Sequence, residues 1–91
     1  MFTLEDAREA ERLCGLIPGA VPLEQIKKGL NVEREHGSMY GFNVTKDRLK
    51  ETAYIVAAHL AEFPDYYERL ERMEAEADAH WRGRRKPKIF Y

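Results

Sequence analysis

The chain has 91 residues, of which 44% are hydrophobic and 34% are charged. This balance excludes an intrinsically disordered chain, and the length leaves room for one domain with a modest core. The formal net charge of −1 hides an asymmetry, because residues 1–81 hold all 16 acidic residues against 10 basic ones, whereas residues 82–91 hold five basic residues and no acidic one. We therefore predict a single folded domain over residues 1–81 and a basic, aromatic C-terminal tail over residues 82–91.

The cysteine count and the first residues indicate the cellular compartment in which the protein is expected. Cys14 is the single cysteine, so the chain can form neither an internal disulfide nor a cysteine-based zinc or redox motif, and a reducing compartment is favoured. The start, MFTLEDAREAER, is acidic, and the longest apolar run, AYIVAA, spans six residues. We expect neither a secretory signal nor a membrane span, and no membrane partner.

Helix signals divide the first half of the chain into two elements. Thr3 with Asp6 three residues on resembles a capping box, and Gly15 is expected to end this first helix. Pro22 suits the first turn of a second helix, which Gly37 ends. The apolar positions of that second helix are Leu23, Ile26 and Leu30.

The second half of the chain contains two more helices joined by a sharp bend. Thr45 is the expected N-cap of the third helix. Phe63 precedes Pro64 and is pushed away from helical backbone angles, while Pro64 suits the start of a fourth helix that Trp81 closes. Apolar spacing assigns the core faces to Leu49, Ala53, Val56 and Leu60 in the third helix and to Tyr66, Leu70, Met73 and Ala77 in the fourth. The sequence therefore predicts an all-α fold, a compact bundle of about four helices.

Two of these helices carry a carboxylate and an imidazole three residues apart on a flank of the apolar stripe. The pairs are Glu33 with His36 and His59 with Glu62. Two oxygen and two nitrogen ligands suit zinc or iron, so the four residues are a candidate site for a divalent metal or a small ligand. The spacing along the helices opposes this hypothesis, because a short connection would leave His36 about 20 Å from His59.

Structural roles explain the same residues. His36 can interact with the free carbonyl groups at a helix C-terminus, and His59 can donate a hydrogen bond to a carbonyl or to Glu33. Asp65 or Glu62 can accept hydrogen bonds from the first amides of the fourth helix. In this interpretation a structural joint is formed by Pro64, Asp65 and Tyr66. The sequence offers no nucleophile–base pair and no phosphate-binding loop, so we identify no catalytic residue and do not expect an enzyme.

Aromatic and basic residues are candidates for binding a partner. One of the two consecutive tyrosines is expected to face outwards, and Tyr67 is the candidate anchor. The tail, WRGRRKPKIFY, combines basic and aromatic residues, which suits either a nucleic acid backbone or the acidic surface of a neighbouring subunit. The candidate partner-binding residues are Tyr67, Trp81, Arg82, Arg84, Arg85, Lys86, Lys88, Phe90 and Tyr91.

Three segments carry a family resemblance: GLxVExEHG at residues 29–37, NVT at residues 43–45 and HLxExPDYYxxLxxME at residues 59–74. In this combination the chain resembles a family of uncharacterised proteins, a domain of unknown function common in bacteriophages and bacteria. The resemblance covers roughly residues 22–77 and leaves out the first helix and the tail. It implies a phage or prophage source but no activity. The motif residues are Glu33, His36, His59, Glu62, Asp65 and Tyr66.

These observations predict a small phage-type accessory protein that acts by protein–protein binding or self-assembly, without catalysis. We expect it in the cytoplasm, which is the host cytoplasm for a phage protein, or in association with the virion. One alternative is a helical domain that binds a metal or small ligand through the Glu/His cluster. A second alternative is nucleic-acid binding through the basic tail.

Overall fold

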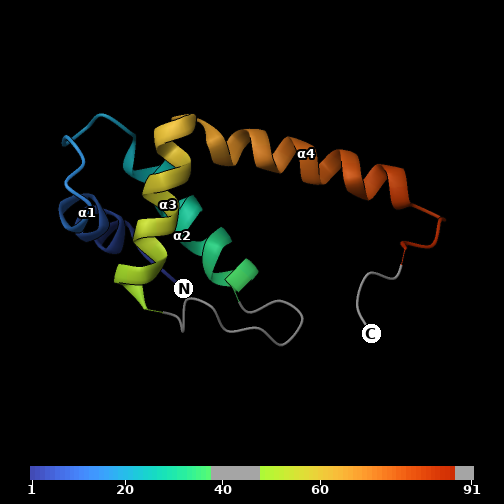
Figure 1. The fold of residues 1–91 in the computed structure, drawn as a ribbon, viewed down its shortest axis with the longest axis horizontal. Helices are drawn as coiled ribbons and strands as arrows, with labels where there is room; N and C mark the ends of the chain where they lie inside the picture. Colours follow the sequence, from blue (N-terminus) through green and yellow to red (C-terminus); the bar gives the residue numbers. More distant parts are fainter. Residues whose placement is uncertain (38–47, 88–91) are drawn as a thin grey trace.

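The computed structural model describes residues 1–37 and 48–87. These residues form four α-helices and no strand: α1 (Leu4–Leu13), α2 (Leu23–Gly37), α3 (Leu49–Glu62) and α4 (Tyr66–Trp81). Helices α1, α2 and α3 lie together at one side of the molecule, and α4 extends away from them (Figure 1). The predicted all-α class with four helices is confirmed. No helix in the described ranges is long and apolar enough to cross a membrane.

The helix starts agree only in part with the sequence signals. The capping box is confirmed, because the Thr3 side chain accepts from the Asp6 amide while the Asp6 carboxylate accepts from the Thr3 amide. Pro22 lies just before α2 rather than in its first turn. Its carbonyl accepts hydrogen bonds from the amides of Gln25 and Ile26. Helix α3 begins later than predicted, with Arg48 as its N-cap. Thr45, the expected N-cap, lies outside the described residues.

The bend between α3 and α4 follows the prediction from Pro64. Phe63 caps α3 in an extended conformation, with φ −139° and ψ 119°, as expected for a residue that precedes proline. A turn then closes through the Tyr66 amide, which donates to the Phe63 carbonyl at 2.9 Å. Helix α4 therefore begins soon after α3 has ended, and Phe63, Pro64 and Asp65 are the whole connection between them.

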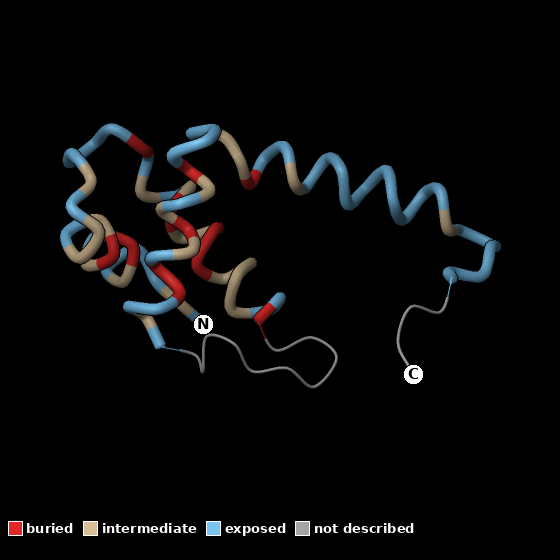
Figure 2. Tube along the Cα trace, in the orientation of Figure 1, coloured by how far each residue is buried: buried red, intermediate tan, exposed pale blue. Residues whose placement is uncertain are grey.

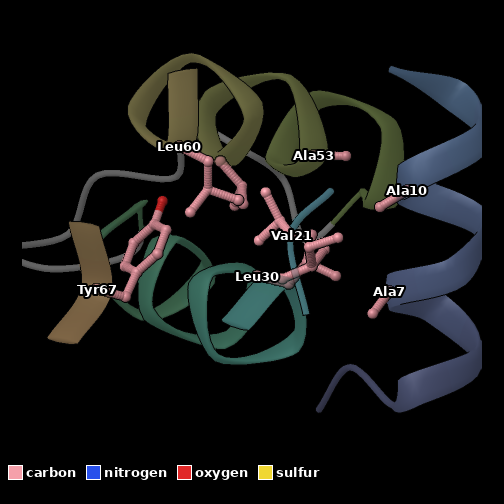
Figure 3. Close-up of a cluster of buried hydrophobic side chains, with 9 residues drawn as sticks. Ala7, Ala10, Val21, Leu30, Ala53, Leu60 and Tyr67 are labelled. Carbon is pink, nitrogen blue, oxygen red and sulfur yellow. The ribbon is translucent and has the colours of Figure 1, made fainter. Parts of the chain in front are cut away.

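The core consists of small and branched side chains from α1, α2, α3 and the linker between α1 and α2, together with one tyrosine from α4. It is drawn in close-up in Figure 3, where α1 presents alanines to the side chains between α2 and α3. The predicted core faces of α2 and α3 are largely confirmed. The buried hydrophobic residues are Ala7, Ala10, Val21, Ile26, Leu30, Ala53, Val56, Leu60 and Tyr67.

Helix α4 contributes one fully buried residue to this core, and two partly buried residues pack beside it. Tyr67 is 1% exposed, and it is the buried residue of α4. The predicted core face is wrong for this helix: Tyr66 and Leu70 are partly buried, whereas Met73 is 58% exposed and Ala77 is exposed. Beyond the first turns the helix is exposed along almost its whole length (Figure 2).

A glycine on α2 explains why Tyr67 is buried. A Cβ atom added to Gly29 would lie 2.5 Å from Cε2 of Tyr67 and 2.9 Å from Cδ2, closer than atoms pack in proteins. The absent side chain therefore lets the Tyr67 ring lie directly on the backbone of α2. The cost is a glycine inside a helix, about 1 kcal/mol relative to alanine, and burial of the ring offsets it.

We therefore expect Gly29→Ala to lower the free energy of unfolding by about 1–3 kcal/mol, as overpacking does in other cores, although alanine is the better helix former. Chemical denaturation followed by circular dichroism measures this change. In a Tyr67→Leu background, Gly29→Ala should lower the free energy of unfolding clearly less, because the leucine side chain does not reach the new methyl group. An equal loss in both backgrounds, or a gain in the wild type, contradicts this packing.

Candidate functional site

The joint between α3 and α4 contains a short polar network. The Tyr67 hydroxyl donates to Glu33 Oε1 of α2 at 3.1 Å. His59 of α3 places Nε2 3.5 Å from the same oxygen. The Glu33 side chain is 14% exposed and that of His59 is 33% exposed, so the carboxylate is the more enclosed of the two. One carboxylate thus links α2 to both helices that meet at the joint.

Aromatic stacking completes the network on the side of Tyr66. The Tyr66 ring lies parallel to the His59 imidazole, with centroids 4.2 Å apart and an interplanar angle of 10°. It also meets the Tyr67 ring edge-on at 5.0 Å. Since His59, Tyr66 and Tyr67 contact one another, the side chains around the bend hold α3 and α4 in one relative orientation.

Burial determines the protonation of Tyr67. Desolvation of the phenol raises its pKa above the ordinary value, and the Glu33 carboxylate adds to the rise because a second negative charge beside it is unfavourable. The hydroxyl is therefore held in its neutral form, in which it can donate to the carboxylate. These contacts give the joint a structural role, since both polar groups satisfy one another.

The four residues predicted to bind a metal do not form one cluster. His36 turns away from Glu33: its Nδ1 donates to the Val32 carbonyl at 2.8 Å, and its Nε2 lies 3.5 Å from Glu74 Oε1 of α4. Glu62 is exposed at the end of α3. Within residues 1–37 and 48–87, no group of three or more His, Cys, Asp or Glu side chains is arranged to hold a metal ion. Glu33 and His59 are brought together, and the structural interpretation of His59 fits their geometry.

Asp65 does not cap α4 as predicted. Its side chain makes no capping hydrogen bond, and its carboxylate instead accepts from Arg69 Nε one turn on, at 2.8 Å. This hydrogen bond lowers the pKa of the Asp65 carboxyl group. The Arg69 guanidinium also lies over the Phe63 ring, 4.3 Å from its centroid, so the pair stiffens the outer side of the bend.

One flank of α4 is paired with α2 through charged and polar side chains. Gln25 donates to Glu68 at 2.8 Å, Lys28 forms an ion pair with Glu71, and His36 meets Glu74. Solvent screens such pairs, so each adds little stability. Together they orient the helix, because they fix which flank of α4 faces α2.

An apolar surface follows the bend and continues along α4. A hollow of about 190 Å³ is lined by Phe63, Tyr66, Arg69, Leu70 and Met73. Phe63 is 48% exposed. Helical spacing adds Ala77 and Trp81 to the same side of the helix. We call this set the α4 stripe: Tyr66, Leu70, Met73, Ala77 and Trp81.

The other predicted partner-binding residues lie near the C-terminus. Trp81 is partly exposed at the end of α4, where its ring meets the His80 ring edge-on. Four tail residues are exposed: Arg82, Arg84, Arg85 and Lys86. Lys88, Phe90 and Tyr91 lie outside the described residues. Tyr67 is too deeply buried to be the exposed anchor that we predicted.

Comparison with known protein families shows where the chain belongs. Residues 4–76 match the family described as "Protein of unknown function (DUF5661)". The chain belongs to the DUF5661 family. No curated protein and no solved structure shows significant similarity to it. The DUF5661 match begins at α1, earlier than the resemblance noted in the sequence, and it ends within α4, before Ala77 and the tail.

Sequence reasoning missed two residues of this DUF5661 joint. Gly29 is one, because a glycine inside a helix carries no local sign of what packs on it. Arg69 is the other, and it contacts both Asp65 and Phe63. It was missed because it is one of the many charged residues of α4. An arginine four residues after an aspartate at a helix start was the available signal.

We expect Tyr67→Phe to lower the free energy of unfolding by about 1–3 kcal/mol near neutral pH, because it leaves the enclosed Glu33 carboxylate without its donor. The wild type should also lose stability as the pH rises above about 10, the pKa of tyrosine in an unfolded chain. Above that pH the unfolded state releases the Tyr67 proton while the folded state keeps it, so unfolding is favoured.

Denaturation of both proteins between pH 7 and pH 11 measures these effects. The Tyr67→Phe variant should show a shallower alkaline loss than the wild type, so that the two curves approach each other. Parallel curves across this range would mean that the Tyr67 proton does not contribute to folding.

Proposed function

We propose that this protein acts without catalysis, by binding a protein through the α4 stripe and the hollow beside it. The observation that carries the proposal is the exposure of apolar side chains on α4 and at its start, with Met73 58% and Phe63 48% exposed. Exposed apolar patches rimmed by charged residues are typical of protein interaction sites. Aromatic residues, methionine and arginine are also the side chains enriched at such sites, and all three types line the hollow.

The enclosed polar groups support a binding role rather than a chemical one. Glu33 accepts the hydrogen bond of the Tyr67 hydroxyl and lies 3.5 Å from His59 Nε2, and these contacts hold α4 in place. A catalytic or ligand-binding site instead presents polar groups to a cavity. The hollow itself is lined by apolar side chains and by Arg69, which is engaged with Asp65 and Phe63.

We also propose a phage or prophage setting, in which the protein is an accessory factor in the host cytoplasm or the virion. The support for this setting is the resemblance carried by the GLxVExEHG and HLxExPDYYxxLxxME segments. Joint residues Glu33, His59, Tyr66 and Tyr67 belong to these segments, and the geometry gives each of them a part in placing α4.

Substitution of Met73 by glutamate should abolish binding, because it places a charge at the centre of the α4 stripe. Ala75→Glu is the matched control, since it adds the same charge to an exposed position on the opposite side of α4. Affinity capture from a host lysate, combined with light scattering of the purified chain, measures complex formation by all three proteins. Complexes that Met73→Glu leaves intact, or a strict monomer that captures nothing, would refute the proposal.

A second candidate function is nucleic-acid binding by the tail, favoured by the exposure of its four described basic residues. The acidic residues of the neighbouring α4 weaken this candidate, because they repel phosphate groups.

If the tail binds nucleic acid, removal of residues 82–91 should abolish a gel shift of DNA or RNA, and the shift of the full chain should weaken with salt. Binding that survives the deletion, or that salt does not affect, excludes the tail as the site.

A further inference from the structure

We propose that a second copy of this chain covers the α4 stripe, with the two α4 helices antiparallel around a two-fold axis. This inference rests on the proposed function and names its partner. The spacing of the stripe carries the first step, because residues 66, 70, 73 and 77 are separated by four, three and four positions. That repeat matches the spacing of a two-helix coiled-coil seam, and a self-complementary face is what a two-fold dimer requires. Tyr66 and Leu70 are half-buried against the chain's own core and keep part of their surface exposed, whereas Met73 and Ala77 are exposed.

The sizes of the side chains select the antiparallel arrangement. With the axis between residues 71 and 72, Leu70 lies opposite Met73 of the second copy, and large Tyr66 lies opposite small Ala77. A parallel pair would instead place each residue opposite itself, with two tyrosines at one end and two alanines at the other. Close packing favours large side chains against small ones, so the antiparallel register fills the seam more evenly.

The shape of the molecule also favours the antiparallel arrangement. Helix α4 leaves the other three helices at its N-terminus and extends beyond them (Figure 1). A parallel pair would bring both three-helix bodies to the same end, where they would compete for space. An antiparallel pair sets the bodies at opposite ends, so the outer half of each α4 lies along the inner half of the other.

Charge complementarity adds a further contact in this register. Arg69 and Glu76 lie on the same flank of the stripe, the one opposite the Glu71 and Glu74 flank that meets α2. Antiparallel pairing places Arg69 within one turn of Glu76 of the second copy, and the symmetry repeats the contact. Arg69 uses Nε for Asp65, and its other guanidinium N–H groups are available to donate across the interface.

The hollow at the bend receives a specific side chain in this register. In this register residue 81 of the second copy lies about one turn beyond Tyr66, at the bend where α4 begins, so its indole reaches the hollow lined by Phe63 and Tyr66. Trp81 is partly exposed in the single chain, at the far end of α4. Tryptophan is the side chain most favoured as an interface anchor, and an apolar hollow is the site that accommodates it.

Sedimentation velocity of the full chain from about 5 to about 500 µM tests the proposal, because an interface of four helical turns is small and its dimer needs high concentration. The mass should rise from monomer to dimer across this range. Met73→Glu should raise the dissociation constant at least about tenfold, and Ala75→Glu should change it less than about twofold. Circular dichroism confirms that both variants are folded.

Cysteine cross-linking tests the register. In a Cys14→Ala background, a mixture of Leu70→Cys and Met73→Cys chains should form the mixed disulfide in preference to either symmetric one, because residues 70 and 73 face each other only in the antiparallel pair. Predominant symmetric disulfides would overturn the antiparallel register.

The outcomes separate the two proposals. A wild type that stays monomeric at every concentration overturns the second copy as partner. If the wild type stays monomeric but captures another protein, and Met73→Glu abolishes that capture, the proposed function of the α4 stripe in binding a protein is retained. A dimer that Met73→Glu leaves unchanged overturns the inference directly, and unchanged capture would then remove the proposed function as well.

Discussion

The contact of the Tyr67 ring with the backbone of α2 at Gly29 determines where α4 lies. Tyr67 is the fully buried residue of α4, and the hydroxyl at the end of its ring donates to Glu33. The ring therefore supplies both the apolar burial that attaches the helix and the hydrogen bond that fixes its angle. Because a Cβ at Gly29 would occupy the space of the ring, the position of α4 depends on a side chain that is absent from another helix.

The direction of the α4 stripe follows from this contact. Tyr67 points into the core, and the charged residues beyond it on that flank meet Lys28 and His36 of α2. On the neighbouring side Tyr66 and Leu70 still pack partly against the core, whereas the residues further along α4 extend beyond it, so Met73 is exposed although its spacing suits burial. The helix is best understood as a presented surface. Its attachment to the rest of the chain depends on the buried Tyr67 ring, on the partial packing of Tyr66 and Leu70 and on a few screened ion pairs.

Much of the fold could be predicted from local signals. The capping box at Thr3, the glycine at position 15 and the proline at position 64 act within a few residues of themselves, and the structure confirms the helix ends that they predicted. The apolar spacing of α3 also assigned its core face correctly. These features depend on backbone geometry and periodicity, which a single sequence contains.

The features that could not be predicted depend on contacts between helices. The apolar spacing of α4 indicated that Tyr66 is buried, whereas Gly29 on another helix selects Tyr67. The pairing of Glu33 with His36 on one helix suggested a metal site, but His36 binds its own helix and Glu74, and Glu33 meets Tyr67 and His59. Helical periodicity gives the direction of a side chain and does not give the partner that it meets.

Amide hydrogen exchange along α4, measured at low and at high protein concentration, tests the central claim most directly. At low concentration the amides from Met73 to Trp81 should exchange much faster than those of α2 and α3, because the outer half of the helix is held only at its inner end. At high concentration these amides should become protected as a second copy covers the stripe. Protection equal to that of α2 and α3 at low concentration, or fast exchange at every concentration, would contradict the account.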